Sequence, residues 1–236
     1  MRAFVIGNGV SLNETPLELL KGEITFAMNR IHLLYDKTDW RPTYWVMVDL
    51  QATDQFDWLD DALINLKEGI KCFLVASMAY HVELNRPAYN PWTDRQVTYL
   101  KICTQHRSMD VRSEDKPLNW HLPELCKFGT GAAVCLQLAV LKGYNPIYVV
   151  SMDLNFQRVE NEQSPDPNHF SENYGVFDEF AHDPELKNRT HEYAHRMAYE
   201  ESQRRGIRIY NATIGGGLNA YPRVEFESLF EKVLDA

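Results

Sequence analysis

Short apolar runs alternate with longer amphipathic stretches along most of this chain. The runs are rich in β-branched and aromatic residues and cover residues 3–6, 24–28, 44–49, 72–77, 147–152 and 207–211. Because they are apolar on both faces, they fit the buried strands of a parallel sheet. Helical periodicity fits residues 15–21, 54–67, 130–143, 190–205 and 225–234. The alternation predicts an α/β fold with a doubly wound, mostly parallel, Rossmann-like sheet.

Two long stretches interrupt this alternation. Residues 80–127 are rich in Pro, Trp, His and Arg, and residues 155–189 hold Pro165, Pro167 and Pro184 among polar residues. Insertions of this length in a compact domain are usually lids or binding loops, so we expect substrate contacts there. The chain has 236 residues, 44% of them hydrophobic. We therefore expect residues 1–236 to form a single Rossmann-like nucleotide-binding domain with two lid-like insertions.

The charge of the chain restricts its partners. A formal net charge of -9 argues against a protein that coats nucleic acid, because such a protein needs a basic face. An anionic ligand must therefore be bound by backbone amides or by a few cationic side chains. The first apolar run is too short for a signal peptide, and the longest later run, AAVCLQLAVL, is shorter than a membrane span. The four cysteines form no C-x-x-C pair, which favours reduced thiols, so we expect a cytoplasmic protein without a transmembrane segment. Formation of a homo-oligomer is an open alternative.

Polar residues follow the predicted strands. In an open parallel sheet, ligands bind beyond the carboxyl ends of the strands, where the strand order reverses. The residues at these positions are Gly7 to Ser11, Asn29-Arg30, Asp49-Leu50-Gln51, Ser77, Asp153-Leu154-Asn155 and Asn211-Ala212-Thr213. We expect a ligand pocket among them.

The turn GNGVSL, residues 7–12, follows the first strand. It has two glycines of the dinucleotide fingerprint, but Leu12 replaces the third and Asn29 stands where an acidic residue is expected, so NAD is not favoured. Glycines let exposed amides approach a phosphate, and Ser11 and Asn8 add polar side chains. A plain tight turn is the alternative interpretation.

A second anion site is predicted at the start of the helix over residues 130–143. Thr130 can cap this helix, and the small residues after it, beginning with Gly131, leave amides free to meet an anion. Lys127, just before the cap, could pair with a phosphate. A capped core helix with no ligand is the alternative.

Histidines suggest two further sites. His191 and His195 match the zinc-protease pattern H-E-x-x-H, but they flank the apolar stripe of a surface helix, and no third ligand has recognisable spacing; we expect no metal site there.

His169 lies in a Pro-rich loop beyond the fifth strand. A histidine that titrates near neutral pH suits removal of a proton from a sugar hydroxyl.

Together these motifs resemble a known family. GNGVSL, Asn29, GTGAAVCLQLAVLKGYNPIYVVSMDL, a loop histidine and IRIYNAT occur in the order found in bacterial family 42 sialyltransferases and the related Maf/DUF115 (MptE-like) proteins. The likeness covers most of the chain and is clearest in residues 1–30 and 128–155. It implies an inverting glycosyltransferase of surface-polysaccharide synthesis, which transfers a nonulosonate from a CMP-activated donor to a glycan acceptor without a required metal.

The resemblance also assigns roles to residues. His169 would be the catalytic base. The nucleotide-binding residues that the resemblance implies are Gly7, Asn8, Gly9, Ser11, Asn29, Thr130 and Gly131. The strand-end positions and the helix start add Lys127, Asp153 and Asn211 to the predicted set. Where the family has tyrosines after the fifth strand to stabilise the departing phosphate, this chain has Asn155-Phe156, and Tyr174 is the next tyrosine.

Two other functions remain open at this point. A pterin pyrophosphokinase in the Maf/DUF115 group suggests a phosphoryl transferase that uses ATP and Mg²⁺, with Asp49 and Asp153 as metal ligands. A non-catalytic nucleotide-binding or assembly protein would use the same pocket without turnover.

Overall fold

A computed structural model gives the fold of the chain. The structure describes residues 1–47, 58–75, 95–102, 120–122, 124–126, 130–161, 164–174 and 183–230. Lys127, Asp49 and Ser77 lie outside the described residues, and so does Cys103. The other three cysteines, Cys72, Cys126 and Cys135, are buried thiols and form no disulfide.

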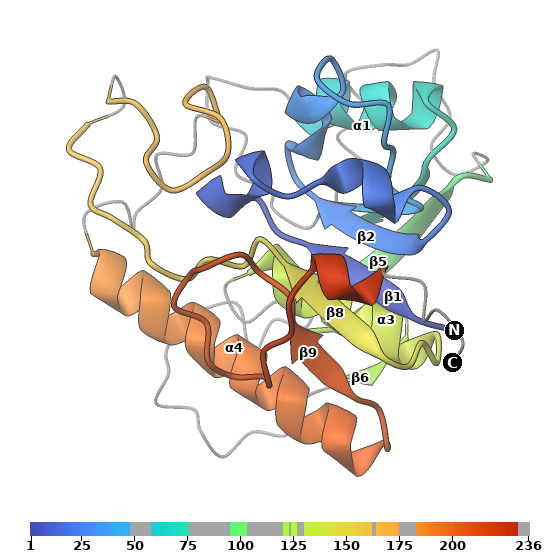
Figure 1. Cartoon of the computed structure of the whole chain (residues 1–236). Helices are drawn as coiled ribbons and strands as arrows, with labels where there is room; N and C mark the ends of the chain where they lie inside the picture. Colours follow the sequence, from blue (N-terminus) through green and yellow to red (C-terminus); the bar gives the residue numbers. More distant parts are fainter. Residues whose placement is uncertain are drawn as a thin grey trace, which may run out of the picture.

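Nine strands form one sheet in the described part of the chain (Figure 1). They are β1 (Ala3–Ile6), β2 (Ile24–Met28), β3 (Tyr44–Met47), β4 (Lys71–Val75), β5 (Val97–Ile102), β6 (Trp120–His121), β7 (Glu124–Leu125), β8 (Ile147–Val150) and β9 (Ile209–Asn211). Their order is β6-β7-β5-β4-β3-β2-β1-β8-β9, and all neighbours are parallel except β6 and β7. The predicted α/β class and the mostly parallel Rossmann-like sheet are confirmed.

The helices of the described residues are partly of another type than predicted. They are α1 (Trp58–Lys67), α3 (Gly131–Leu141) and α4 (Pro184–Arg204), with 3₁₀ helices at η1 (Val10–Asn13), η2 (Leu17–Leu20), η3 (Ile31–Leu34) and η5 (Glu227–Leu229). Of these, none combines the length and the apolar composition that crossing a bilayer requires.

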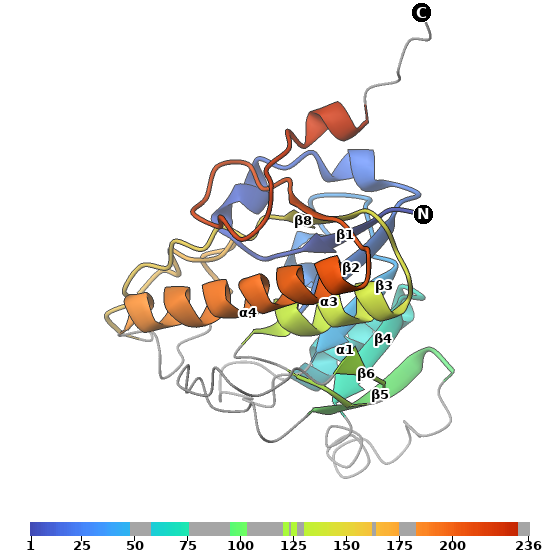
Figure 2. The same ribbon diagram turned by 90° about the horizontal axis from the view of Figure 1, so that it is seen from below.

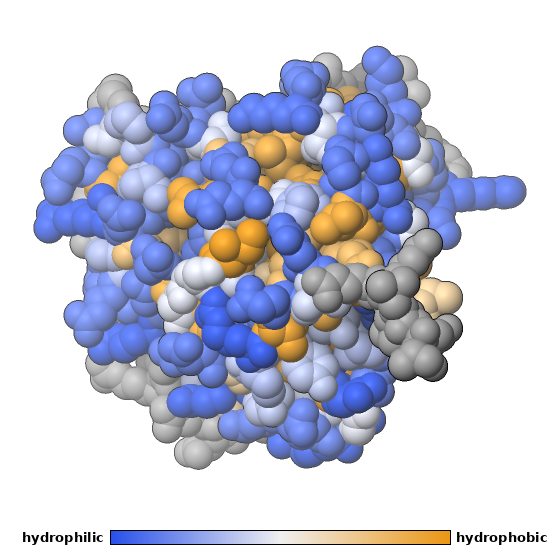
Figure 3. Space-filling model, viewed as in Figure 1, coloured by the Kyte–Doolittle hydropathy of each residue, from blue (hydrophilic) through white to orange (hydrophobic). Residues whose placement is uncertain are grey.

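Helical layers cover both faces of the sheet (Figure 2). Successive residues of β1 point to opposite faces: Ala3 and Val5 pack with α3, whereas Phe4 and Ile6 pack with η1 and η2. α3 lies against β1, β2 and β3 and beside α4, and α1 covers β3 and β4. On the surface seen in Figure 3 hydrophilic side chains predominate, and apolar residues emerge in small areas between them.

The strand order reverses beside β1. The chain runs outward from β1 through β2, β3, β4 and β5, and then returns to place β8 on the other side of β1. Ala3 pairs with Ile147 and Ile6 pairs with Val150, so β1 and β8 end level with each other. The segments after Ile6 and Val150 therefore leave the sheet side by side, at the position where ligands bind in such folds.

The expectation of an unstructured insertion over residues 80–127 is wrong in part. Val97–Ile102 forms β5, which extends the sheet beyond β4, and Glu124–Leu125 adds β7. β5 is half-exposed, with only Leu100 fully buried along it, so its sequence VTYLKI lacks the continuous apolar run of the inner strands.

Three helix predictions also need correction. Pro16 precedes η2, and the predicted helix over residues 15–21 is a short 3₁₀ helix there. α4 begins at Pro184 rather than at residue 190, because Asp183 caps it and proline is well suited to the first helical position. The terminal helix is the 3₁₀ turn η5, and residues 231–236 lie outside the described residues.

Candidate functional site

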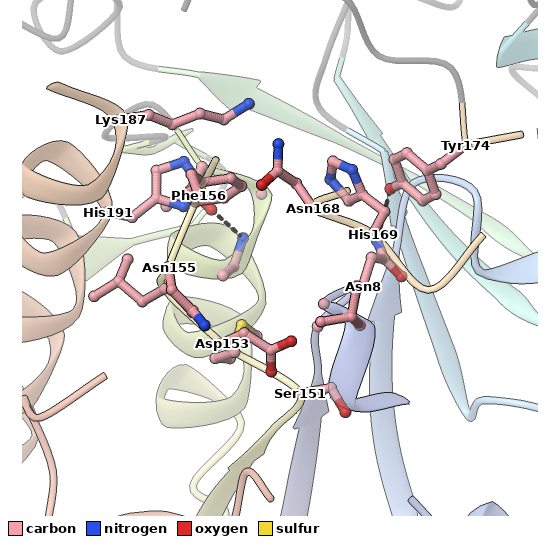
Figure 4. Close-up of a pocket in the computed structure, with 18 of the residues that line it drawn as sticks. Asn8, Ser151, Asp153, Asn155, Phe156, Asn168, His169, Tyr174, Lys187 and His191 are labelled. Carbon is pink, nitrogen blue, oxygen red and sulfur yellow. Dashed lines mark hydrogen bonds between the residues drawn. The ribbon is translucent and has the colours of Figure 1, made fainter. Parts of the chain in front are cut away.

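A cavity opens beyond the carboxyl ends of β1 and β8, where the strand order reverses (Figure 4). Its walls come from the turn after β1, the end of β2, the start of α3, the loop after β8 and one face of α4. The lining residues that carry polar side chains are Asn8, Asn29, Thr130, Ser151, Asp153, Asn155, Gln157, Asn168, His169, Tyr174, Lys187, His191 and His195. The cavity therefore lies where the sequence predicts a ligand pocket, and the loop after residue 155 contributes to it.

The glycines of the GNGVSL turn allow it to pack against the end of β8. A Cβ on Gly7 would overlap the carbonyl oxygen of Ser151, and a Cβ on Gly9 would lie 2.5 Å from the carboxylate of Asp153. The Gly9 amide donates to the Ser151 carbonyl at 3.1 Å. Both glycines are thus required by a close approach inside the protein, whether or not a ligand also contacts them.

Asp153 accepts hydrogen bonds from both donors of Ser11, the residue that the sequence predicts to contact a phosphate. The Ser11 amide donates to Asp153 Oδ2 at 2.9 Å, and the Ser11 hydroxyl donates to Asp153 Oδ1. Ser11 is buried and is not among the cavity-lining residues. On the other side, the Gly217 amide donates to the Asp153 carbonyl at 2.5 Å. Asp153 is therefore a buried brace between two loops, and its carboxylate lies where an incoming phosphate would be repelled.

Asn8 holds the loop that carries His169. Its side-chain Nδ2 donates to the Met28 carbonyl at 3.1 Å and to the Tyr174 hydroxyl at 2.8 Å. Its backbone carbonyl accepts a hydrogen bond from the Phe170 amide at 3.0 Å. Asn8 Oδ1 is buried with no hydrogen-bond partner among the described residues. The first turn of the sheet thus fixes a loop that follows it by about 160 residues.

His169 is held on two sides. Its Nδ1 lies 2.6 Å from Asp166 Oδ2, and its ring stacks flat on Tyr174 with centroids 3.9 Å apart and planes at 4°. Burial opposes ionisation of Asp166, but the hydrogen bonds from His169 and from the Asn168 amide outweigh it and lower the pKa of that carboxyl. The carboxylate fixes the tautomer, so Nε2 is the nitrogen available to accept a proton from the cavity.

α4 forms the opposite wall. Lys187, His191 and His195 follow one another at intervals of four residues, and all three line the cavity. His195 is buried, its Nδ1 lies 2.9 Å from the Tyr221 hydroxyl, and burial lowers its pKa to about 4. α4 is a surface helix, as the sequence predicts, but His195 lies on its buried face rather than on the flank of its apolar stripe. Across the described residues, no group of three or more His, Cys, Asp or Glu side chains could hold a metal ion.

Three residues around the cavity have unusual backbone conformations. Asn29, Ser151 and Leu154 have φ values of 49°, 54° and 50°, and they are the non-glycine residues with positive φ in the described part of the chain. Each such conformation costs about 1–3 kcal/mol and persists only when its surroundings enforce it. Because all three line the cavity, this clustering supports its identification as the functional site.

The start of α3 forms the back of the cavity. The Thr130 hydroxyl accepts from the Ala132 amide at 3.2 Å, so the predicted cap is present, and Thr130 and Gly131 both line the cavity. Asn29 lies beside them, and its Oδ1 is buried without a hydrogen-bond partner in the described residues. Lys127, the remaining member of this predicted group, is outside the described residues.

Asn211 stabilises the loop after β9 and does not line the cavity. Its Nδ2 donates to the Leu218 carbonyl at 2.8 Å, and its Oδ1 accepts from the Thr213 amide at 2.9 Å. The side chain is fully buried and is not among the residues that line the cavity. Its predicted nucleotide contact has no geometric support.

Sequence reasoning missed three residues of the site and discounted a fourth, His191. Asp166, the partner of His169, precedes it by three residues in PDPNH, a spacing that could have suggested the pair. Lys187 and His191 fall on the cavity side of α4, and Asn168 donates its Nδ2 hydrogen to the Gln157 carbonyl at 2.9 Å across the loop. The sequence pattern predicts this helix only from residue 190, which leaves Lys187 in the preceding loop, whereas α4 begins at Pro184.

Comparisons with known proteins bear on the fold. No protein-family model matches the sequence, and no curated protein does. Among solved structures, the fold is similar to that of a Maf glycosyltransferase from Magnetospirillum magneticum AMB-1, with a TM-score of 0.54 and 13% identity. The match covers 96% of this chain and 34% of that protein, so this chain spans about a third of its length.

Proposed function

We propose that the cavity is the active site of a glycosyltransferase that transfers a nonulosonate-type sugar from a CMP-activated donor to a glycan hydroxyl with inversion. The observation that carries this proposal is the Asp166–His169 pair, which presents a basic nitrogen to the cavity at the sheet's strand-order reversal. Support comes from the similar fold of a Maf glycosyltransferase. The family 42 resemblance supplies the CMP donor and the nonulosonate.

His169 is the general base in this mechanism. Its Nε2 accepts the proton of the acceptor hydroxyl while that oxygen forms a bond to the anomeric carbon of the donor. The bond from that carbon to the phosphate oxygen breaks, and the electron pair leaves with CMP. Asp166 keeps His169 in the reactive tautomer and stabilises the imidazolium that forms, and Tyr174 fixes the plane of the ring.

The remaining walls of the cavity suit the donor. Asn8 and Asn29 contribute polar side chains beside the start of α3, where Thr130 and Gly131 face the cavity. No metal is required in this mechanism, because a side-chain base and protein hydrogen-bond donors supply its chemistry. The alternative Mg²⁺ site would use Asp153, but both of its carboxylate oxygens accept hydrogen bonds from Ser11.

The test is turnover of the His169→Gln variant. CMP release from a set of CMP-nonulosonates, measured with a panel of glycan acceptors, should fall by about 10²- to 10⁴-fold relative to the wild type. The dissociation constant for CMP should stay within about twofold, because His169 acts on the acceptor. Equal turnover by the variant and the wild type would remove His169 from the mechanism.

A further inference from the structure

The charges of the described cavity residues are separated between its two ends. Lys187 carries the one permanent positive charge among the described lining residues, and Asp153 carries the one carboxylate. In Figure 4 Lys187 reaches over the cavity at the top, beside Asn168, whereas Asp153 lies at the bottom near Ser151. An anionic group of a ligand is therefore attracted to the Lys187 end and repelled from the turn after β1.

A bracket of contacts holds the cationic end in place. Asn188 Oδ1 accepts from the Phe156 amide at 3.0 Å, which fastens the loop after β8 to α4. The Phe156 ring then contacts both cavity-facing side chains: Lys187 Nζ lies 4.7 Å from its centroid, and the His191 ring meets it edge-on at 4.9 Å. Phe156 thus forms a platform that presents Lys187 and His191 together.

This platform stands beside the catalytic pair, with the ring centroids of Phe156 and His169 6.5 Å apart and the rings edge to face. In Figure 4 Lys187, Phe156 and His191 stand on one side, and His169 and Tyr174 stand on the other. In a displacement with inversion, the attacking oxygen and the leaving oxygen are on opposite sides of the reacting carbon. A base on one wall and a cation on the other match that requirement.

We propose that Lys187, with His191 and Asn168, forms the subsite for the donor's phosphate and stabilises it as CMP departs. This inference rests on the proposed function, and it assigns the phosphate to α4 rather than to the GNGVSL turn. As the bond from the anomeric carbon to the phosphate oxygen breaks, negative charge grows on that oxygen. Lys187 Nζ, and donor hydrogens of His191 and Asn168, offset this charge.

Calorimetric titration with CMP and with cytidine tests the subsite, because the two probes differ only by the phosphate. The wild type should bind CMP more tightly than cytidine, and Lys187→Met should weaken CMP binding about tenfold or more while leaving cytidine binding unchanged. Lys187→Arg should restore most of the difference. Lys142→Met is the matched control, since Lys142 Nζ lies 5.0 Å from the centroid of the Tyr44 ring, and Lys142 is not among the cavity-lining residues.

The outcomes separate this subsite from the proposed function. If Lys187→Met weakens CMP and cytidine equally, or weakens neither, the subsite is overturned while a CMP-dependent enzyme stands. If the wild type does not bind CMP but binds ATP or inorganic pyrophosphate, and Lys187→Met weakens that binding, the subsite stands and the CMP donor is overturned. If no phosphorylated probe binds with Lys187 dependence, the subsite is overturned.

Discussion

Individual residues in this site have roles that their type alone does not reveal. Asp153, which follows a strand and could hold a metal, instead accepts two hydrogen bonds from Ser11. His169, one loop histidine among eight in the chain, gains its role from the carboxylate of Asp166 and the ring of Tyr174. Chemistry at this scale depends on contacts between residues, because a partner decides which nitrogen is basic and which oxygen is occupied.

Replacing Asp166 by Asn should slow turnover while the affinity for CMP is unchanged. The amide keeps the acceptor for the Asn168 amide, which lies 2.8 Å from Asp166 Oδ1, but it no longer stabilises a charged imidazolium. Because the NH₂ group then donates to His169 Nδ1, it favours the tautomer whose Nε2 already carries a proton, and we expect a loss of about 10²- to 10⁴-fold in the transfer rate. Kinetics with a CMP-nonulosonate and calorimetry with CMP measure the two quantities, and a parallel loss of CMP affinity would indicate a structural role instead.

Replacing Asp153 by Asn should destabilise the fold. The Asn oxygen still accepts from the Ser11 amide and its NH₂ group can donate to the Ser11 hydroxyl, so the variant loses the extra strength of hydrogen bonds to a charged carboxylate, about 1 kcal/mol in the free energy of unfolding. Urea denaturation measures this cost, and Asp39→Asn, whose side chain is 95% exposed, is the control. Unchanged stability together with loss of Mg²⁺-dependent ATP binding would favour the metal-site interpretation.

At the scale of elements, the sequence predicts the inner strands best. β1, β3 and β8 are buried along their whole length, so they are apolar on both faces, and the pattern is unambiguous. β5 is half-exposed and was missed. α4 was placed too far along the chain because Pro184 is equally at home in a loop and at a helix start.

The start of α3 offers a direct test at this scale. Thr130→Ala removes the oxygen that accepts from the Ala132 amide, and we expect a loss of about 1 kcal/mol in the free energy of unfolding. Thr130→Ser keeps the hydroxyl and should lose much less. Urea denaturation of the two variants distinguishes a cap from a residue whose only role is in the ligand site, for which both variants would unfold like the wild type.

At the scale of the whole molecule, the sheet brings together residues that no local pattern connects. Ser11 and Asp153 are 142 residues apart, and Asn8 and Tyr174 are 166 residues apart. The position of the site was predictable, because residues after parallel strands gather at one edge of a sheet. Its partner contacts were not, since they depend on which strands are neighbours and on where the loop after β8 folds back.

Stability should fall as the pH falls from about 6.5 to 4. Burial lowers the pKa of His195 to about 4, and burial with nearby Arg30 does the same for His32, whereas both titrate near 6.5 in an unfolded chain. Between these pH values the histidines are protonated in the unfolded chain but not in the folded chain. The free energy of unfolding therefore decreases as the pH falls, by up to about 3 kcal/mol for His195. Above this window the contribution is constant.

His195→Asn isolates the share of one histidine. The variant should show a shallower decline of the free energy of unfolding between pH 6.5 and pH 4, and His32 should account for part of the remaining slope. Urea denaturation at several pH values measures both slopes. Parallel curves for the wild type and the variant would mean that folding does not lower the pKa of His195.

Calorimetric titration of the wild-type chain with CMP, in the absence and presence of Mg²⁺, tests the central claim most directly. The cavity at the junction of β1 and β8 should bind CMP saturably without Mg²⁺, and ATP should not compete at the same concentration. At about 100 times its dissociation constant, CMP should add roughly 2.7 kcal/mol to the free energy of unfolding. No binding at millimolar CMP, or binding of ATP that requires Mg²⁺, would contradict a CMP-dependent glycosyltransferase.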